Sequence, residues 1–483
     1  MKKIGTTLAL ALLSAALSLP GQERFRKSPP PPEPRQELKL PPIETSPLFD
    51  NGLRISVVSK DNLPMMSLHL IIFDGESSSP DRSPGTATFA AHMLTRSTQL
   101  HSAPELEELI ESMGGTLSVS TYQDFTLVAF YFLEEFLNQA LELLGQMLLQ
   151  PKFTEKEIQS VKTVLSLDLM EKEKDPEFVA KRHLIRLLFK KHPYEKLSFS
   201  RDAIKTWNQN DLLEFFDQHY RPNNAHLILT GNININNAAR KVTRYLGTWQ
   251  PRKLIAKPFP PIMPLQEANI CFIDVPLAKD CAIYLGVQVP FSNDLDPAAL
   301  SIVSQVLGGT ANSRLFMNLR ESKGYAYFAF SGAEFYKMGG LFCVWARVTP
   351  EFIYPSVQEI LNEVRKMSKE PIAASEIDQA KPYLIGNFPV SIERFDAFSG
   401  KAAEIIAYNW GDEHWNKYYE QITLVSPEKI FAAAQKCFLQ PPLIVVAGDK
   451  TRLAARLGEF ESIDVYDSKG VKQYNVKKER SPK

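Results

Sequence analysis

The chain has little cysteine and no excess of charge of either sign. Only four cysteines occur among 483 residues, all in the second half, and none forms a C-x-x-C pair. This spacing fits neither a zinc clip nor a dense disulfide framework, so we expect free, partly buried thiols. Lysine plus arginine and aspartate plus glutamate both number 55, which gives zero net charge. Without a broad basic field we expect no nucleic-acid partner, and without an acidic bias no solvating acidic tail.

The clearest local signal is an apolar run in the first twenty residues, I-G-T-T-L-A-L-A-L-L-S-A-A-L-S-L, which follows two lysines and ends near Pro20. A basic start, a short apolar core and small residues near a cleavage point are typical of a secretory signal peptide. The run is short for a membrane span. No cysteine follows it for lipidation, and no arginine precedes Arg24, as a mitochondrial presequence would require. We therefore predict a signal peptide over 1–21, export, most simply into a bacterial periplasm, and no stable membrane anchor.

Proline marks the candidate boundaries of domains. Residues 22–47 are rich in proline and too poor in apolar residues to pack, which predicts an extended linker. A second proline-rich stretch over 249–264 is typical of an interdomain linker. Residues 466–483 are polar and basic, and we expect them to form a frayed tail. These boundaries leave two domains, 48–248 and 265–465.

The two domains repeat one order of elements. In the first, strands are predicted at 53–59, 66–73, 116–121, 125–132 and 226–233, and helices at 84–97, 102–115, 133–149 and 154–172. In the second, strands are predicted at 268–275, 282–289, 325–332, 340–348 and 442–450, and helices at 296–307, 313–322, 350–368 and 374–388. This pattern is an internal duplication of an α+β unit of roughly two hundred residues. We expect each unit to be a mainly antiparallel sheet with helices on one face.

In the stretch G-T-A-T-F-A-A-H-M-L at 85–94, three residues have the spacing of a known zinc-binding motif. Thr88 lies four residues before His92, so both share one face of the predicted helix, and Ala91 directly precedes His92. With histidine at 88 and glutamate at 91, this stretch would contain H-x-x-E-H, the inverted zincin signature.

Three further features make a family resemblance specific. They are the stretches H-P-Y through H-Y-R-P-N-N-A-H-L-I-L-T-G-N-I (192–233) and V-L-G-G-T-A-N-S-R-L-F-M-N-L-R-E-S-K-G-Y-A-Y-F-A-F-S-G (306–332), and the duplication itself. With the helix at 85–94, they resemble the insulinase/pitrilysin-type zinc metallopeptidases over most of 45–460. That family includes mitochondrial processing peptidase and its bacterial relatives, and the resemblance implies their two-domain fold.

The resemblance also implies that the zinc site has been lost. Family members bind zinc through two histidines of H-x-x-E-H and a glutamate on a later helix, and the glutamate of the motif activates water. The matching positions here are Thr88, His92 and Asp168 for the ligands and Ala91 for the base. A catalytic zinc needs three protein ligands, and loss of a general base costs a factor of roughly 10²–10⁴ in rate. We therefore expect no metal in this chain, and an ordinary helix histidine with a hydrogen-bond partner at His92.

A second half-site is retained. Family members carry an arginine and a tyrosine seven residues apart, opposite the zinc, which hold the substrate and the oxyanion. The matching residues are Arg320 and Tyr327, and a guanidinium and a phenol can both donate hydrogen bonds to a developing negative charge. In the alternative interpretation both residues have a structural role only: Arg320 is a cation at a helix C-terminus, and Tyr327 is an ordinary aromatic residue of a β-sheet. Gly308 and Gly309 match a substrate-contacting glycine segment of the family's inactive subunits, but they could equally end a helix.

These features favour one function over two others. The leading hypothesis is the non-zinc subunit of an exported heterodimeric peptidase. Such a subunit supplies the arginine–tyrosine pair and half of the chamber wall to a homologous partner that carries zinc and an intact H-x-x-E-H. The substrate would be a peptide or an unfolded protein. The alternative is a non-catalytic peptide-binding or scaffold protein of the same fold, and an autonomous metallopeptidase would need a metal site that the sequence lacks.

Overall fold

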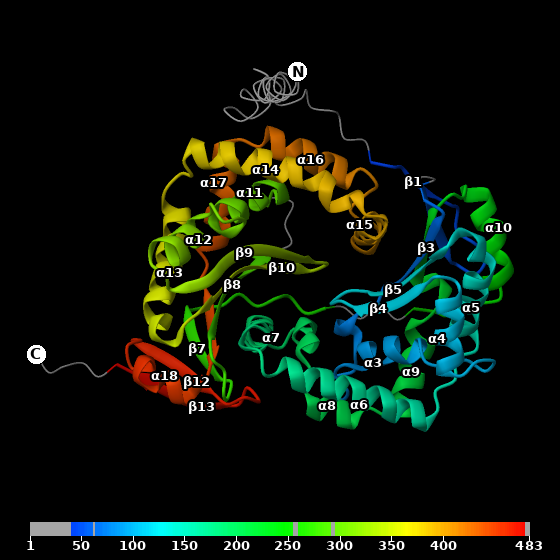
Figure 1. The fold of residues 1–483 in the computed structure, drawn as a ribbon, viewed down its shortest axis with the longest axis horizontal. Helices are drawn as coiled ribbons and strands as arrows, with labels where there is room; N and C mark the ends of the chain where they lie inside the picture. The colour runs from blue at the N-terminus through cyan, green and yellow to red at the C-terminus, as the bar shows by residue number, and fades with distance from the viewer. Residues whose placement is uncertain (1–39, 61–62, 255–258, 291–294, 479–483) are drawn as a thin grey trace, which may run out of the picture. The chain divides into compact units, whose positions relative to one another are not determined.

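The computed structural model describes residues 40–60, 63–254, 259–290 and 295–478. The predicted signal peptide and most of the predicted linker over 22–47 lie outside these residues. Two β-sheets with flanking helices make up the described part of the chain (Figure 1). In those same ranges, no helix combines the length and the apolar character needed to cross a membrane.

Six strands form the first sheet: β1 (Ile43–Thr45), β2 (Arg54–Ser59), β3 (Met65–Ile72), β4 (Thr116–Thr121), β5 (Thr126–Leu133) and β6 (Ala225–Gly231). Their order is β1-β2-β6-β3-β5-β4, with β2 parallel to β6 and every other neighbour antiparallel. Strand β1 lies inside the predicted linker over 22–47, so this prediction was wrong for its last residues. Ile43 pairs with Val58, which explains why this short segment is ordered.

Seven strands form the second sheet: β7 (Asn269–Asp274), β8 (Cys281–Pro290), β9 (Ala326–Tyr336), β10 (Gly339–Val348), β11 (Leu443–Gly448), β12 (Ser462–Tyr466) and β13 (Lys472–Lys477). Their order is β13-β12-β7-β11-β8-β10-β9. The prediction of a frayed tail over 466–483 was wrong where β13 pairs antiparallel with β12. Strand β12 is anchored because Ile463 and Val465 are buried in the core of the second sheet.

The two sheets share one topology. Five strands of each sheet, β2 to β6 and β7 to β11, have the same spatial order. By sequence they run first, last, second, fourth, third: β2-β6-β3-β5-β4 and β7-β11-β8-β10-β9. In both, the first and last strands are parallel. The predicted duplication and the mainly antiparallel α+β architecture are confirmed.

Each sheet packs against a layer of helices whose apolar sides enter its core. The helices of the first layer are α3 (Thr86–Leu94), α4 (Ala103–Ser112), α5 (Leu137–Leu149), α6 (Glu155–Lys172), α8 (Arg201–Thr206), α9 (Gln209–His219) and α10 (Ile235–Leu246). Those of the second are α11 (Pro297–Gly308), α12 (Arg314–Phe316), α13 (Ile353–Lys369), α14 (Ala374–Glu393), α16 (His414–Leu424), α17 (Pro427–Phe438) and α18 (Lys450–Leu457). The helix predicted over 313–322 is α12 followed by a π-helical turn, η5 (Met317–Ser322).

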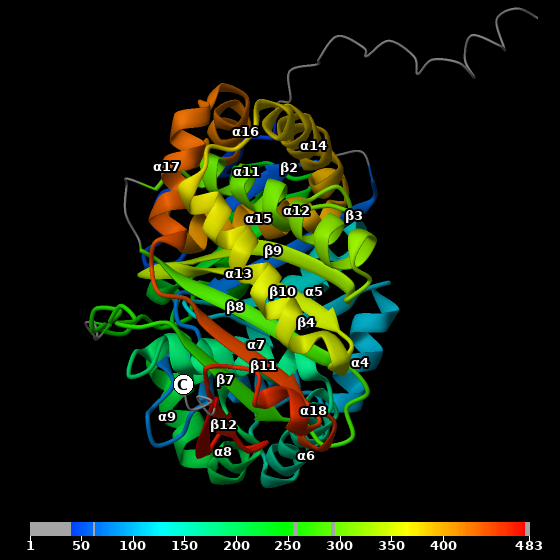
Figure 2. The same cartoon turned by 90° about the vertical axis from the view of Figure 1, so that its left-hand side faces the viewer.

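Helix α7 (Pro176–Leu188) belongs to the first domain by sequence but covers the other face of the second sheet. Along β8, Ile283 and Leu285 face the core with α11 and α13, whereas Tyr284 faces the core that contains Leu184 of α7. Thus α13 and α7 lie on opposite faces of the second sheet (Figure 2). The approach is close: a Cβ on Gly286 would lie 2.8 Å from Leu184 Cδ2. The prediction of helices on one face only was therefore wrong for this sheet.

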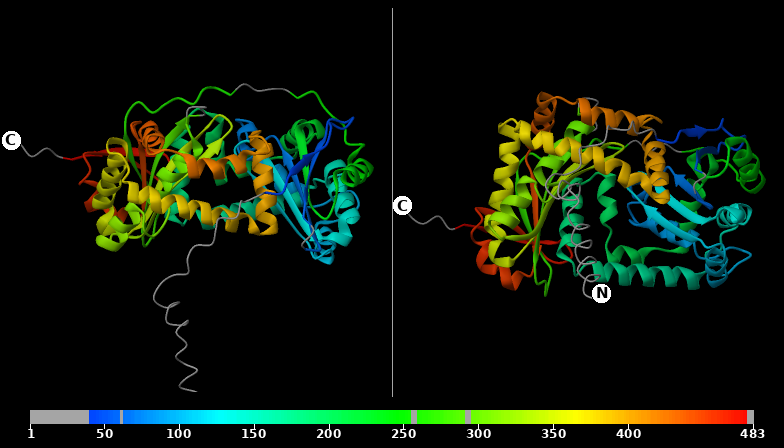
Figure 3. Two further views of the ribbon diagram at one scale, coloured as in Figure 1. Left: turned by 90° about the horizontal axis from the view of Figure 1, so that it is seen from above. Right: turned by 45° about the horizontal axis from the view of Figure 1, so that its top comes forward.

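Helix α15 (Phe395–Tyr408) makes the reverse crossing, from the second domain to the first sheet. Its buried Ser399 Oγ lies 3.0 Å from Thr230 Oγ1 and 3.2 Å from Ser67 Oγ, on the face of β6 and β3 that the first helical layer leaves uncovered. Helix α14 leads from the second helical layer to α15 (Figure 3). Each predicted domain thus contributes one helix to the sheet of the other.

This exchange predicts that the domains stay together when the chain between them is cut. A specific protease site inserted after Leu254 should give two fragments on a denaturing gel that still co-elute as one particle in native gel filtration. The physical reason is the burial of apolar side chains of α7 in the second domain. Fragments that separate without denaturant would contradict the exchange.

Candidate functional site

Helix α3 carries three of the degenerate zinc positions, Thr88, Ala91 and His92, and neighbouring segments hold it in place. It begins after Gly85, whose φ of 89° favours glycine, and a Cβ there would lie 2.4 Å from Trp207 Cζ2. The Trp207 indole stacks on Phe89 at 5.0 Å and donates a hydrogen bond to the Pro84 carbonyl at 2.8 Å. These contacts fix the position of the helix without a metal.

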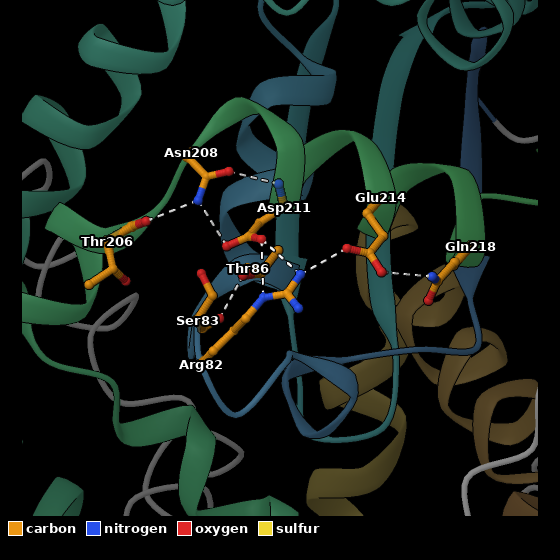
Figure 4. A network of polar contacts seen from close by, with 8 residues as sticks. All are labelled: Arg82, Ser83, Thr86, Thr206, Asn208, Asp211, Glu214 and Gln218. Carbon is orange, nitrogen blue, oxygen red and sulfur yellow. Dashed lines mark hydrogen bonds and ion pairs between the residues drawn. The ribbon is translucent and has the colours of Figure 1, made fainter.

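Exposed ion pairs hold the loop before α3 against α9 (Figure 4). The Arg82 guanidinium donates to Asp211 at 2.9 Å and to Glu214 at 2.8 Å. From the first residue of α3, Thr86 Oγ1 donates to the Ser83 carbonyl of this loop at 2.6 Å. Because Arg82 is 63% exposed, its ion pairs contribute little to stability and mainly orient the loop.

A buried carboxylate, Glu76, caps α3 and was missed from the sequence. Its oxygens accept hydrogen bonds from the Gly85 amide at 2.6 Å, the Thr88 amide at 3.2 Å and the Thr88 hydroxyl at 2.9 Å. Two otherwise unpaired amides at the start of the helix are thereby satisfied. Glu76 lies nine residues before Gly85, outside the spacing of a local capping box, so only the neighbouring loop geometry reveals it.

Thr88, His92 and Asp168 lie on the wall of one cavity of about 450 Å³, between α3, α6, α7 and β8. The Thr88 hydroxyl is engaged with Glu76, and the Asp168 carboxylate pairs with Lys172 at 2.8 Å. Ala91 is fully buried and carries no acid or base. Among the described residues, no cluster of three or more histidine, cysteine, aspartate or glutamate side chains could hold a metal ion. The side chains at these positions therefore do not fit a catalytic zinc.

His92 is half-buried on this wall. Burial lowers the pKa of its imidazole below the ordinary 6.5, and the nearby Arg96 lowers that pKa further, while Asp168 acts in the opposite direction. The ring is therefore neutral at neutral pH. Within the described ranges no hydrogen bond to the His92 ring occurs, in contrast to the expected partner.

Arg320 and Tyr327 both sit on irregular backbone. Arg320 lies in the π-helical turn η5, and its guanidinium stacks over the Phe316 ring at 4.9 Å. Tyr327 is the extra residue of a β-bulge, because Ala326 and Phe328 pair with the consecutive residues Val348 and Arg347. π-turns and bulges often re-aim side chains at functional sites. Both side chains are about half exposed, at 50% and 52%.

Neither Arg320 nor Tyr327 lines the cavity that contains His92, so the two half-sites do not share one cavity. Gly308 and Gly309 have packing roles. A Cβ on Gly308 would lie 2.5 Å from the Ser331 amide of β9, and one on Gly309 would lie 2.6 Å from Gln305 Cα. Both glycines therefore let the end of α11 pack closely.

The lost ligands predict how zinc can be restored. The natural chain should hold no stoichiometric zinc after dialysis and cleave no peptide alone. The double variant T88H/D168E supplies a second imidazole and a longer carboxylate beside His92, and should hold about one zinc per chain by metal analysis. It should remain inactive because Ala91 provides no base.

The single variant D168E is the control, with one ligand fewer because it lacks the second imidazole. About one tightly held zinc in the natural chain, or chelator-sensitive cleavage by it, would show that the zinc site is not lost.

Glu76 predicts a pH-dependent stability. Burial raises the pKa of this carboxyl from 4.5 to about 7, although hydrogen bonds from Ser79, Thr88 and Gly85 lower it. Between these values the folded chain keeps a proton that the unfolded chain releases. Stability from this group is therefore full below pH 4.5 and is lost as the pH rises through 7. Relative to Glu76→Gln, the free energy of unfolding of the natural chain should fall by about 1–3 kcal/mol from pH 5 to pH 8.

Denaturant unfolding at several pH values measures this difference. Glu108→Gln, on the exposed side of α4, is the control and should leave the pH profile unchanged. Parallel profiles for Glu76→Gln and the natural chain would contradict the assignment.

Comparison with known proteins points to one family. The family model described as "Insulinase (Peptidase family M16)" matches residues 54–200, and the one described as "Peptidase M16 inactive domain" matches residues 206–384. The "Non-peptidase homolog YmxG" of Helicobacter pylori is 26% identical over 349 residues, 71% of this chain and 80% of that protein. The "Uncharacterized zinc protease YmxG" of Bacillus subtilis is 23% identical over 348 residues, 71% of this chain and 83% of that protein.

Solved structures share the fold. A protease from Helicobacter pylori superposes with a TM-score of 0.80 at 21% identity, covering 85% of this chain and 100% of that one. A peptidase M16 inactive domain from Pseudomonas fluorescens gives a TM-score of 0.77 at 21% identity, covering 84% of this chain and 98% of that one. At this identity the likeness concerns the fold alone.

Proposed function

Because the chain belongs to the insulinase (M16) peptidase family and lacks its zinc site, we propose that it is the zinc-free subunit of an exported heterodimeric metallopeptidase. In this proposal it supplies Arg320, Tyr327 and half of the chamber wall to a homologous partner with zinc and an intact H-x-x-E-H. The substrate is a peptide or an unfolded protein. The signal peptide predicted over 1–21 supports export to a periplasm.

The observation that carries the proposal is an asymmetry between the two half-sites. On α3 and α6, threonine replaces a ligand at 88 and donates to Glu76, and the half-exposed Asp168 pairs with Lys172. On the second sheet, Arg320 and Tyr327 remain half exposed on a π-turn and a bulge. An irregular backbone costs stability and persists where a function or the surrounding packing requires it. A chain that had lost every catalytic role would have no such need for this pair.

The chemistry of the pair suits an acyl-transfer transition state. Stacking on Phe316 restricts the Arg320 guanidinium, and the Tyr327 phenol is available as a second donor. Donors held in advance stabilise the oxyanion that forms as a peptide carbonyl is attacked. The partner's zinc, when bound, would activate the attacking water. Both β4 and β9 lie at free edges of their sheets, so an extended substrate can add main-chain hydrogen bonds there.

A non-catalytic peptide-binding or scaffold protein is the alternative. One observation favours it: Gly308 and Gly309 are explained by packing alone, without a substrate. The alternative and the leading proposal differ in what Arg320 and Tyr327 do in the assembled complex.

Reconstitution with a zinc-bearing homologue from the same source tests the proposal. The mixture should cleave peptides that neither chain cleaves alone. Arg320→Ala or Tyr327→Phe should lower kcat by about 10²–10³, because an oxyanion donor acts mainly on the transition state. Gel filtration and metal analysis should show an intact complex and unchanged zinc in the partner.

Matched controls are Arg365→Ala on α13 and Tyr383→Phe on α14, both exposed and outside η5 and β9. They should leave kcat unchanged. An assembled Arg320→Ala/Tyr327→Phe double variant with undiminished cleavage would make the chain a scaffold.

A further inference from the structure

A cavity of about 760 Å³ lies at the end of β9 opposite Tyr327, and aromatic rings dominate its wall. The rings come from three distant parts of the chain: the turn between β4 and β5, the end of β9, and the segment from α15 to α16. We call it the aromatic cavity, framed by Tyr122, Phe125, Tyr336, Tyr408, Trp410 and Trp415. Its volume is within the range of about 300–1,000 Å³ that is typical of ligand pockets.

The rings support one another instead of filling the cavity. Tyr408 stacks on Trp410 with ring centres 5.0 Å apart, and Tyr122 stacks on Phe125 at 4.5 Å. The Phe125 ring meets Tyr408 edge-on at 5.6 Å, which joins the wall of the first domain to that of the second. Rings held in this way present fixed π-faces, and a ligand that packs on them orders few side chains.

The charged side chains on the wall are already paired. Lys401 Nζ lies 2.8 Å from Glu404 and 4.4 Å from the centre of the Trp415 ring. Glu334 accepts from Lys181 Nζ at 2.5 Å and from the Tyr336 hydroxyl at 2.9 Å. Among the described lining residues, no charged group is left to attract a phosphate or a free cation. The wall therefore favours a neutral, apolar ligand.

In the described part of the chain, the edge strands β4 and β9, one from each sheet, both end at this cavity. Strand β4 ends at Thr121, next to Tyr122, and β9 ends at Tyr336. A polypeptide paired along either edge would carry one of its side chains to the cavity. Tyr327 and Tyr336 are nine residues apart on β9, which at about 3.3 Å per residue is roughly 30 Å. The aromatic cavity is therefore remote from the arginine–tyrosine pair.

We propose that the aromatic cavity binds a large apolar side chain, aromatic in preference, of an extended polypeptide, at a distance from the bond to be cleaved. The proposal rests on the proposed function, since it assumes that the chamber takes polypeptide. The cavity selects segments that are exposed in unfolded proteins, where such side chains are not yet buried.

Gly400 on α15 offers a way to fill the cavity without removing a ring. It lines the cavity, and a Cβ there would meet no atom within 4 Å. Gly400→Leu should therefore occupy the space and keep the fold, because leucine favours a helix more than glycine does. Gly386→Leu is the matched control: this glycine lies within α14, a Cβ there also meets nothing within 4 Å, and it does not line the cavity.

The experiment measures fluorescence anisotropy of labelled peptides of about twelve residues, long enough to span an edge strand. The peptides differ only in a central Phe, Leu or Ala, and the full chain is titrated against each. The Phe peptide should bind at least about tenfold more tightly than the Ala peptide, because its ring leaves water. Gly400→Leu should remove this advantage, whereas Gly386→Leu should keep it. Thermal melting confirms that both variants are folded.

Three results would overturn the proposal. One is equal affinity for the Phe and Ala peptides, and another is a Phe advantage that survives in folded Gly400→Leu. The third is competition by free N-acetylphenylalaninamide at the same concentration as the peptide, which would indicate a small-molecule pocket. Reconstituted cleavage that still depends on Arg320 and Tyr327, alongside any of these results, would leave the proposed function standing and refute this inference alone.

Discussion

The packing of α7 against the second sheet is the contact on which the rest of this structure depends. Leu184 and its apolar neighbours bury a face of β8 that would otherwise be open, and Gly286 leaves the room for them. The same helix closes the cavity that contains His92, and its Lys181 pairs with Glu334 beside the aromatic cavity. One helix therefore joins the domains, forms part of the wall around His92 and holds a residue that lines the aromatic cavity. The return crossing of α15 makes this exchange reciprocal.

The degenerate zinc site shows that the position of α3 does not depend on a full set of zinc ligands. The start of α3 is fixed by Gly85, by the Trp207 ring and by the Glu76 carboxylate, none of which is a metal ligand. Once the ligands were gone, Thr88 could serve as a hydrogen-bond donor to Glu76. Because the helix does not depend on zinc for its position, replacement of the ligands left the fold intact.

The second half-site, Arg320 and Tyr327, lies on irregular backbone, in contrast to the zinc positions on α3. Regular secondary structure would bury or realign Arg320 and Tyr327, but a π-turn and a β-bulge keep both side chains at the surface. Along the same edge strand, the aromatic cavity lies at the far end. A single strand thus connects a polar pair suited to a developing charge with an apolar site suited to a side chain. In the proposed function, chemistry and recognition are separated along one extended substrate.

The sequence by itself determined most strands, half of the helices, the duplication and the degenerate zinc motif. Alternating and helical patterns placed strands β2 to β11 and the helices α3 to α6 and α11 to α14, but not α7 to α10 or α15 to α18. Threonine at 88 and alanine at 91 exclude the zinc chemistry by residue identity alone. Periodicity shows which face of a strand is apolar, but not what covers it. Only the tertiary structure decided that α7 and α15 cross between domains, that β13 orders the expected tail, and that Glu76 caps α3. It also brought Tyr122 and Trp415 to one cavity, because contacts between residues so far apart in the chain depend on how the sheets and helices pack.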